Sequence, residues 1–83
     1  MNEVFLIGKI NTDIDFKFII NSKNISIALF EIELLDKQRV KVKAYNEMAD
    51  LCYRKLKQKD WLFVNGRIER DGIVYASGEL LMK

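Results

Sequence analysis

The sequence predicts an all-β fold, a five-stranded Greek-key barrel of the OB type with one helix between the third and fourth strands. Three observations lead to this prediction. Short segments of alternating apolar residues account for most of the 83 positions, one segment near the middle has the apolar spacing of a helix, and two glycines stand in apolar rows. Because a chain of this length has room for one core, we expect residues 1–83 to form a single domain.

The first predicted strand covers residues 4–10. Its apolar side chains alternate onto one face, and Gly8 stands in the same row. A glycine there removes a side chain where another strand must approach closely, as Gly66 does again in the segment 62–68. Two glycines on inner rows favour a small closed barrel over a flat sheet.

Turn-forming residues at 11–15 and 21–24 flank a second strand at 16–20, which we expect to continue the first one. The following strand has two apolar rows of opposite phase, which are Ile25, Ile27, Leu29 and then Phe30, Ile32, Leu34. We therefore predict a β-bulge near Leu29-Phe30, which places both rows on the inner face and bends the strand.

A basic strand at residues 39–45 leads directly into the predicted helix. One face of this strand carries Arg39, Lys41, Lys43 and Tyr45. Three cations at this spacing can follow a phosphate backbone, and the ring can stack on a base. A solvated outer face of a sheet has the same composition, and this segment alone leaves both interpretations open.

The helix is expected from about Glu47 to Gln58, with Asn46 as its N-cap. Cys52 falls within its apolar stripe, so we expect a buried, inert thiol there. Strands at 61–70 and 73–81 follow, joined by a two-residue turn at Asp71-Gly72. We expect Trp61 to pack against the end of the helix.

Composition narrows the classes of function. The 14 basic and 12 acidic residues leave a net charge of +2, so affinity for nucleic acid depends on how the cations are arranged. Histidine is absent, and no phosphate loop, paired-cysteine motif or serine elbow occurs. We therefore expect no enzyme, metal, cofactor or small-molecule substrate. The single cysteine and the lack of a long apolar run predict a cytoplasmic protein without a membrane span.

Three motifs in order resemble bacterial single-stranded-DNA-binding proteins. NEVFLIGKI at residues 2–10 is similar to that family's opening strand, and YNEMADLC at 45–52 to its aromatic residue and the helix after it. VNGRI at 64–68, preceded by Leu56-Lys57, resembles its hydrophobic-x-glycine-x-hydrophobic segment. The likeness covers nearly the whole chain and is closest to a compact, tail-less member or a primosomal replication relative.

This resemblance implies an OB-fold that forms a homodimer or homotetramer and binds single-stranded DNA without sequence preference, in replication, recombination or repair. By position, Lys17 and Phe18 match a basic-aromatic pair of the family, Lys41 a basic residue, and Tyr45 a stacking ring. Two tryptophan positions of the family are Leu35 and Arg39 in this chain. The long hairpin with its further tryptophan is short here, and we expect no acidic recruiting tail.

The predicted binding residues are cations and rings on outward faces, and they are Lys9, Lys17, Phe18, Arg39, Lys41, Lys43, Tyr45, Phe63, Arg67 and Arg70. Lys9, Arg67 and Arg70 extend the basic row if the first and fourth strands flank the third. Two alternatives remain open at this stage. One is an oligomeric adaptor of a replication or mobile-element complex that captures a protein partner and binds DNA weakly, and the other is an RNA-binding OB module.

Overall fold

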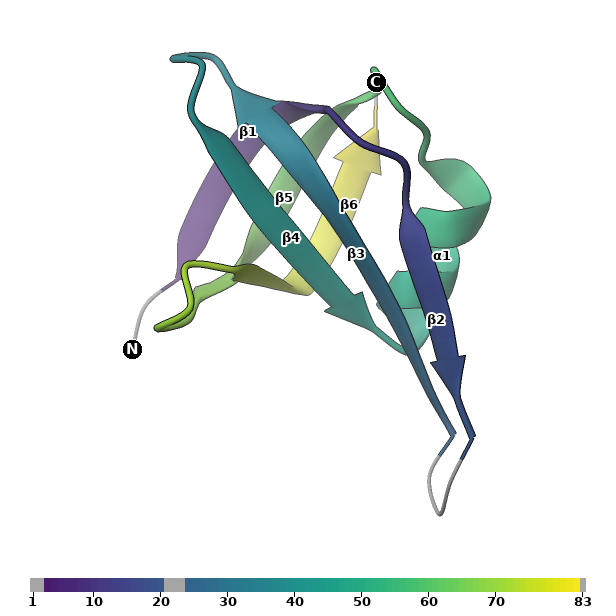
Figure 1. Cartoon of the computed structure of the whole chain (residues 1–83). Coiled ribbons are helices and arrows are strands. Elements are labelled where there is room, and N and C mark those ends of the chain that lie inside the picture. The colour runs from purple at the N-terminus through teal and green to yellow at the C-terminus, as the bar shows by residue number, and fades with distance from the viewer. Residues whose placement is uncertain (1–2, 21–23, 83) are drawn as a thin grey trace.

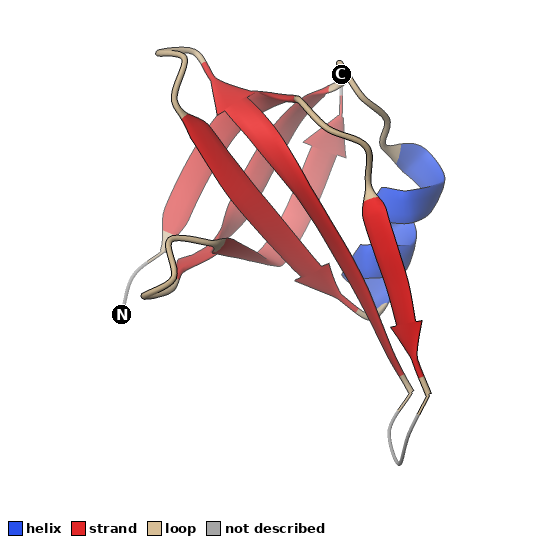
Figure 2. Ribbon diagram, viewed as in Figure 1, coloured by secondary structure: helices blue, strands red, loops and turns tan. Residues whose placement is uncertain are grey.

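Alternating apolar and polar side chains form six strands, and one amphipathic segment forms a helix. The computed structural model describes the backbone of residues 3–20 and 24–82, and the side chains of these residues as far as position 76. In chain order the elements are β1 (Val4–Ile10), β2 (Asp15–Ile19), β3 (Ile25–Leu34), β4 (Arg39–Tyr45), α1 (Glu47–Lys55), β5 (Trp61–Ile68) and β6 (Val74–Met82) (Figures 1 and 2).

The strands form one sheet in the order β1-β5-β6-β4-β3-β2, and a further pairing of β1 with β3 closes it into a barrel. All pairings are antiparallel except that of β4 with β6, which is parallel. Because β2 continues β1 along β3, the six strands form a five-stranded barrel. The helix α1 lies between β4 and β5 in the chain, as the sequence predicts. In Figure 1 the C-terminal end of β2 and the start of β3 project beyond this barrel, on the side of α1.

The second strand continues the first along the same edge of β3. Ile10 of β1 pairs with Ile32, and Asp15 of β2 pairs with Leu29. Four residues link the two strands where β3 has only two, so the linker bends. Asn11 and Thr12 hold this bend on Glu31, whose backbone N–H donates to Thr12 Oγ1 at 3.0 Å. The Asn11 side chain donates to Glu31 Oε1 at 2.8 Å.

The predicted bulge at Leu29-Phe30 is wrong. Pairing of β3 with β2 and β4 runs without a register shift, and buried residues alternate regularly along it. The inner row begins with Ser26 and Ala28, so Ile25, Ile27 and Leu29 lie on the outer face. Ala28 pairs with Ala44 on β4, and these small side chains leave room for α1, which packs on both strands. The register shift lies instead between β5 and β6, beside Gly66.

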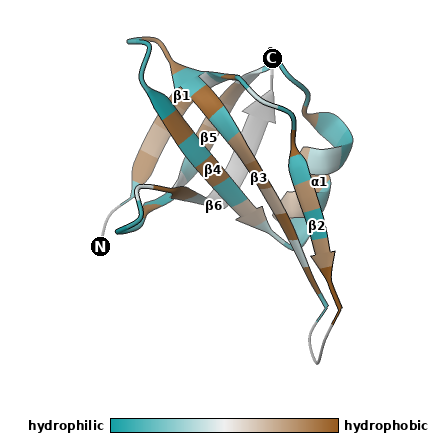
Figure 3. Cartoon of the chain, in the orientation of Figure 1, coloured by the Kyte–Doolittle hydropathy of each residue, from teal (hydrophilic) through white to brown (hydrophobic). Residues whose placement is uncertain are grey.

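The core joins the inner faces of the strands to one side of α1. Its buried members are Ile10, Ala28, Phe30, Ile32, Val42, Ala44, Ala49, Cys52, Leu56, Leu62, Val64 and Val74. Figure 3 shows the alternation that produces this core as brown and teal bands along β3 and β4. Burial raises the pKa of the Cys52 thiol to about 11, which makes it the inert thiol expected from its place in the helix.

The ends of α1 differ from prediction in two ways. The helix ends at Lys55 rather than at Gln58, because Leu56 is extended and directs its side chain into the core. Asn46 occupies the N-cap position, but its side chain makes no capping bond. Its backbone N–H instead donates to the Ser26 carbonyl at 2.8 Å, which ties the start of the helix to β3.

The turn between β5 and β6 is longer than the predicted two residues. Glu69 and Ile73 close it through a backbone hydrogen bond of 3.1 Å, which leaves three residues in the loop, Arg70 to Gly72. The Gly72 N–H donates to the Glu69 carbonyl, and Gly72 has a φ of 79°. A turn followed by a left-handed glycine is the usual three-residue hairpin, and it needs that glycine.

Substitution of Gly66 tests the close approach of β5 and β6. A Cβ there would collide with the Tyr75 carbonyl, whereas a Cβ on Gly72 would meet no atom within 4 Å. We expect Gly66→Ala to lower the free energy of unfolding by about 1–3 kcal/mol, because backbone must shift. Gly72→Ala, the control, should cost about 1 kcal/mol through its left-handed conformation. Chemical denaturation measures both, and a Gly66→Ala protein as stable as the wild type would contradict the close approach of β5 and β6.

Candidate nucleic-acid interface

Outward side chains of five strands form continuous rows across one side of the barrel. Residues that pair across neighbouring strands lie on the same face, so the register defines these rows. One row is Lys17–Ile27–Tyr45, and the next is Asp15–Leu29–Lys43–Tyr75–Arg67. Together they run from β2 to β5 and combine cations with apolar and aromatic side chains.

Lys43, Tyr45 and Tyr75 form the centre of this surface, and we call them the tyrosine cluster. The two rings lie nearly parallel, with 6.2 Å between centroids and 11° between planes. Lys43 Nζ lies 5.7 Å from the centroid of the Tyr45 ring and 5.8 Å from that of the Tyr75 ring. The cluster therefore offers π-faces for a base beside a cation for its phosphate.

The turn between β5 and β6 fixes Tyr75. The Tyr75 hydroxyl donates to Asp71 Oδ2 at 3.0 Å, and the other oxygen of that carboxylate accepts from the Ile73 N–H at 2.9 Å. These bonds stabilise the charged carboxylate, led by the Ile73 N–H, so the pKa of Asp71 is lowered. The hydrogen bond to Asp71, with its negative charge, raises the pKa of Tyr75 above its usual value.

Apolar side chains on β3 continue the surface toward the β2–β3 hairpin. Ile25, Ile27 and Leu29 lie half-buried on the outer face, between Lys17 and the tyrosine cluster. Apolar side chains accept the faces of all bases alike and make no hydrogen bonds that distinguish them. This arrangement favours contacts that tolerate any sequence.

Acidic residues oppose two of the predicted cations. Lys41 pairs across the sheet with Glu31, and Arg39 pairs with Glu33. Opposite charges in directly paired positions attract each other, so these cations are less available to a phosphate. Lys43 differs, because Leu29 and Tyr75 are its cross-strand neighbours.

Lys9, Arg67 and Arg70 extend the basic row if the first and fourth strands flank it, and this condition is not met. The neighbours of β4 are β3 and β6, not the first and fourth strands of the five-stranded order. Lys9 and Arg39 nevertheless lie in one cross-strand row, because both pair with Glu33 on β3. Arg67 and Lys43 lie in another, because both pair with Tyr75 on β6. Arg67 also forms an ion pair with Glu69, with 3.7 Å between Nη2 and Oε2. Arg70 lies exposed in the turn.

The structure places three aromatic side chains outside the tyrosine cluster. Phe18 lies on the opposite face of β2 from Lys17, the face where Phe16 stacks on Tyr53 of α1 with 4.6 Å between centroids. Phe63 faces outward as predicted but contacts Phe5, at 5.8 Å between centroids, away from the tyrosine cluster. The contact described for Trp61 is with Lys9 rather than with the helix. Trp61 lies on the outer face of β5, where Lys9 Nζ is 5.5 Å from its ring centroid.

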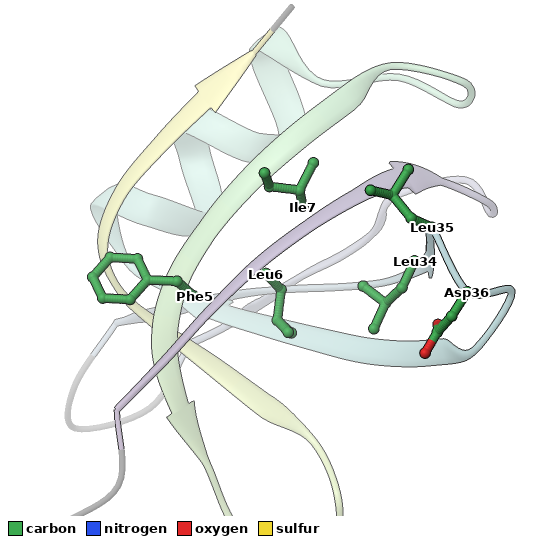
Figure 4. A pocket seen from close by; sticks show the side chains of 6 residues that line it. All are labelled: Phe5, Leu6, Ile7, Leu34, Leu35 and Asp36. Atoms are coloured by element: carbon green, nitrogen blue, oxygen red, sulfur yellow. The ribbon is translucent and has the colours of Figure 1, made fainter.

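An apolar groove lies along β1 and the end of β3. Its volume is about 370 Å³, and its lining residues are Phe5, Leu6, Ile7, Leu34, Leu35 and Asp36 (Figure 4). Phe5 is 61% exposed and Leu35 is 74% exposed, which are large fractions for such side chains. The groove includes Leu34 at one end of β3, whereas Tyr45 pairs with Ile27 near the other end, so the groove lies apart from the tyrosine cluster.

Tyr75 is the residue that sequence reasoning missed. Its alternation with the buried Val74 is consistent with an outward side chain, but the sequence paired this strand only with the one at 61–70, across the turn. The parallel pairing of β6 with β4 brings it beside Lys43.

Within the described part of the chain, no group of three or more His, Cys, Asp or Glu side chains is placed to hold a metal ion. No helix in that part is long and apolar enough to cross a bilayer.

Solved structures share this fold. The chain is similar to the single-stranded DNA binding protein from Thermus aquaticus, with a TM-score of 0.86 and 23% identity, over 100% of this chain and 40% of that one. It is also similar to the SSB domain of a Synechococcus protein, with a TM-score of 0.78 and 14% identity, over 96% of this chain and 93% of that one. No family model and no curated protein matches the sequence. The likeness establishes the OB-fold.

The environment of Tyr75 can be tested by titration. We expect Tyr75 of the wild type to ionise at a pKa above the usual value of a tyrosine, because its hydroxyl donates to Asp71, and Tyr75→Phe should remove that step. Asp71→Ala should return it toward the usual range, since both the bond and the nearby charge are lost. Absorbance of the phenolate follows the titration. If Tyr75→Phe removes a step of ordinary pKa, the bond to Asp71 does not form in solution.

Proposed function

We propose that this protein binds single-stranded DNA without sequence preference, through the tyrosine cluster and the apolar row beside it. The observation that carries the proposal is the cluster itself, with two nearly parallel rings and the Nζ of Lys43 close to both. Stacking on an exposed ring contributes roughly 1–3 kcal/mol per base and accepts every base. The outer surface of strands two and three of an OB barrel, here β3 and β4, is the usual site for oligonucleotides.

Two further features support the proposal. Proteins of the same fold include the single-stranded DNA binding protein from Thermus aquaticus. The outer rows also match what a single strand presents, with rings and apolar side chains for bases and Lys17, Lys43 and Arg67 for phosphates. The protein acts without catalysis in this proposal, in replication, recombination or repair, and it does so in the cytoplasm.

The first experiment is a titration of labelled oligo-dT of about 35 nucleotides followed by fluorescence anisotropy, at low and moderate salt. The proposal requires saturable binding of the single strand that exceeds binding of a duplex control. Competition with a matched oligo-U separates this proposal from an RNA-binding module, which would prefer the ribose strand. Absence of binding to either strand would overturn the proposed function and leave the adaptor role, in which a protein partner is captured.

Cations of the interface should contribute unequally. We expect Lys43→Ala to flatten the dependence of log K on log salt by about 0.7, the contribution of one phosphate contact on a single strand. Lys41→Ala should change this slope by less than half as much, because Glu31 lies opposite it. Lys55→Ala on α1 is the control with the same loss of charge. Equal slopes for the Lys43 and Lys41 variants would contradict the assignment.

We propose further that a second copy of the chain covers the groove of Figure 4. Phe5, Ile7 and Leu35 are all about half exposed or more, and obligate homodimers bury apolar surfaces of this kind. An interface at this groove leaves the tyrosine cluster exposed, because the cluster lies on β4 and β6. The resemblance to a homo-oligomeric family agrees with this assembly.

The assembly can be tested by sedimentation. Phe5→Glu should convert a dimer or tetramer to a smaller species at micromolar concentration, because a charge cannot be buried without a partner. Ile20→Glu is the control, since Ile20 is 77% exposed and lies just after the end of β2, outside the groove. A 9.8 kDa wild-type monomer at micromolar concentration would contradict the second copy.

A further inference from the structure

A carboxylate lies beside the proposed binding surface, where phosphates of a bound strand would approach it as like charges. Asp71 is exposed in the turn after β5, next to the tyrosine cluster. On charge alone its presence opposes binding of a polyanion. Its contacts point to a different role.

Both oxygens of Asp71 are occupied by fixed donors. One accepts from the Ile73 N–H at 2.9 Å, and the other accepts from the Tyr75 hydroxyl at 3.0 Å. The carboxylate thereby joins the ring of Tyr75 to the backbone of the turn. The turn itself is defined by hydrogen bonds from Glu69 N–H to the Ile73 carbonyl and from Gly72 N–H to the Glu69 carbonyl.

The bond to Asp71 holds Tyr75 at one end, and stacking on Tyr45 orients its face. A ring held in this way already lies at 11° to the Tyr45 ring. It therefore loses less conformational entropy on stacking against a base than a mobile ring would. The Lys43 ammonium lies near both rings, and it also offsets part of the negative charge of Asp71 toward an approaching phosphate.

We infer that Asp71 is a positioning residue, which holds the Tyr75 ring parallel to Tyr45 and so maintains a two-ring stacking surface for the bases of a single strand. This inference rests on the proposed function. It assigns a supporting role to an acidic side chain whose charge alone would weaken binding. Arg70 and Gly72, the other two residues of the loop, make no such bond to Tyr75 among the contacts described.

The two roles of Asp71 predict opposite signs, which makes the test sharp. If Asp71 acts as a like charge only, Asp71→Ala should strengthen binding of labelled oligo-dT. If it positions Tyr75, Asp71→Ala should weaken binding by about threefold to tenfold, the effect of one lost hydrogen bond. Glu69→Ala is the charge control, because it removes an acidic side chain that forms an ion pair with Arg67 and no described hydrogen bond to Tyr75. Loss of this charge should leave binding unchanged or strengthen it.

Two further variants separate positioning from damage to the fold. Tyr75→Phe keeps the ring and the charge of Asp71 but removes the bond, so it should weaken binding at least as much as Asp71→Ala, which also removes a like charge. The double variant should then bind no more weakly than either single one. Asp71→Asn, whose amide can still bond the phenol oxygen, should restore most of the affinity. Thermal unfolding of each variant accompanies the titrations, and a purely structural role would lower Tm without these differences in binding.

The outcomes are distinguishable from failure of the proposed function. A wild type that does not bind oligo-dT overturns the proposed function, and the inference with it. A wild type that binds, together with an Asp71→Ala variant that binds equally or more tightly, overturns the positioning role alone. Additive losses in the double variant also overturn it, because independent effects do not pass through one bond.

Discussion

The barrel depends on a short parallel pairing between β4 and β6. Two residue pairs describe it, Val42 with Val74 and Lys43 with Tyr75. The first pair is completely buried and contributes to the core, whereas the second faces outward and forms the candidate site. This pairing thus joins β6 to β4 within the sheet and also assembles the binding surface. Because the same strands serve both purposes, stability and the placement of Tyr75 are linked.

Tight curvature requires small side chains at specific places, and the chain provides them. Gly8 lies where a Cβ would come within 2.9 Å of the Glu33 carbonyl, so it permits β1 to cross β3 closely. Ala28 and Ala44 form a cross-strand pair under α1, and the helix adds Ala49 to the same buried cluster. Larger residues at these positions would hold the helix away from the barrel.

Sequence reasoning predicted the strands, the helix position and the barrel, because alternation and two glycines depend on local geometry. It failed where two apolar rows compete for one face, as around Leu29, since period alone does not say which row is inside. It also failed for Tyr75, whose neighbour is determined by a pairing 32 positions away in sequence, with Lys43. The basic row was recognised correctly as an outer face, but the acids opposite Lys41 and Arg39 depend on register.

The burial of Cys52 has a practical consequence. It is the one cysteine in the sequence, its side chain is inaccessible, and its pKa of about 11 keeps the thiolate scarce at neutral pH. A cysteine introduced on the surface can therefore carry a fluorophore or spin label without a cysteine-free background. Exposed positions on the turn after β5 and on the rim of the groove can each be labelled in the otherwise native chain, so distances can be measured between them in solution.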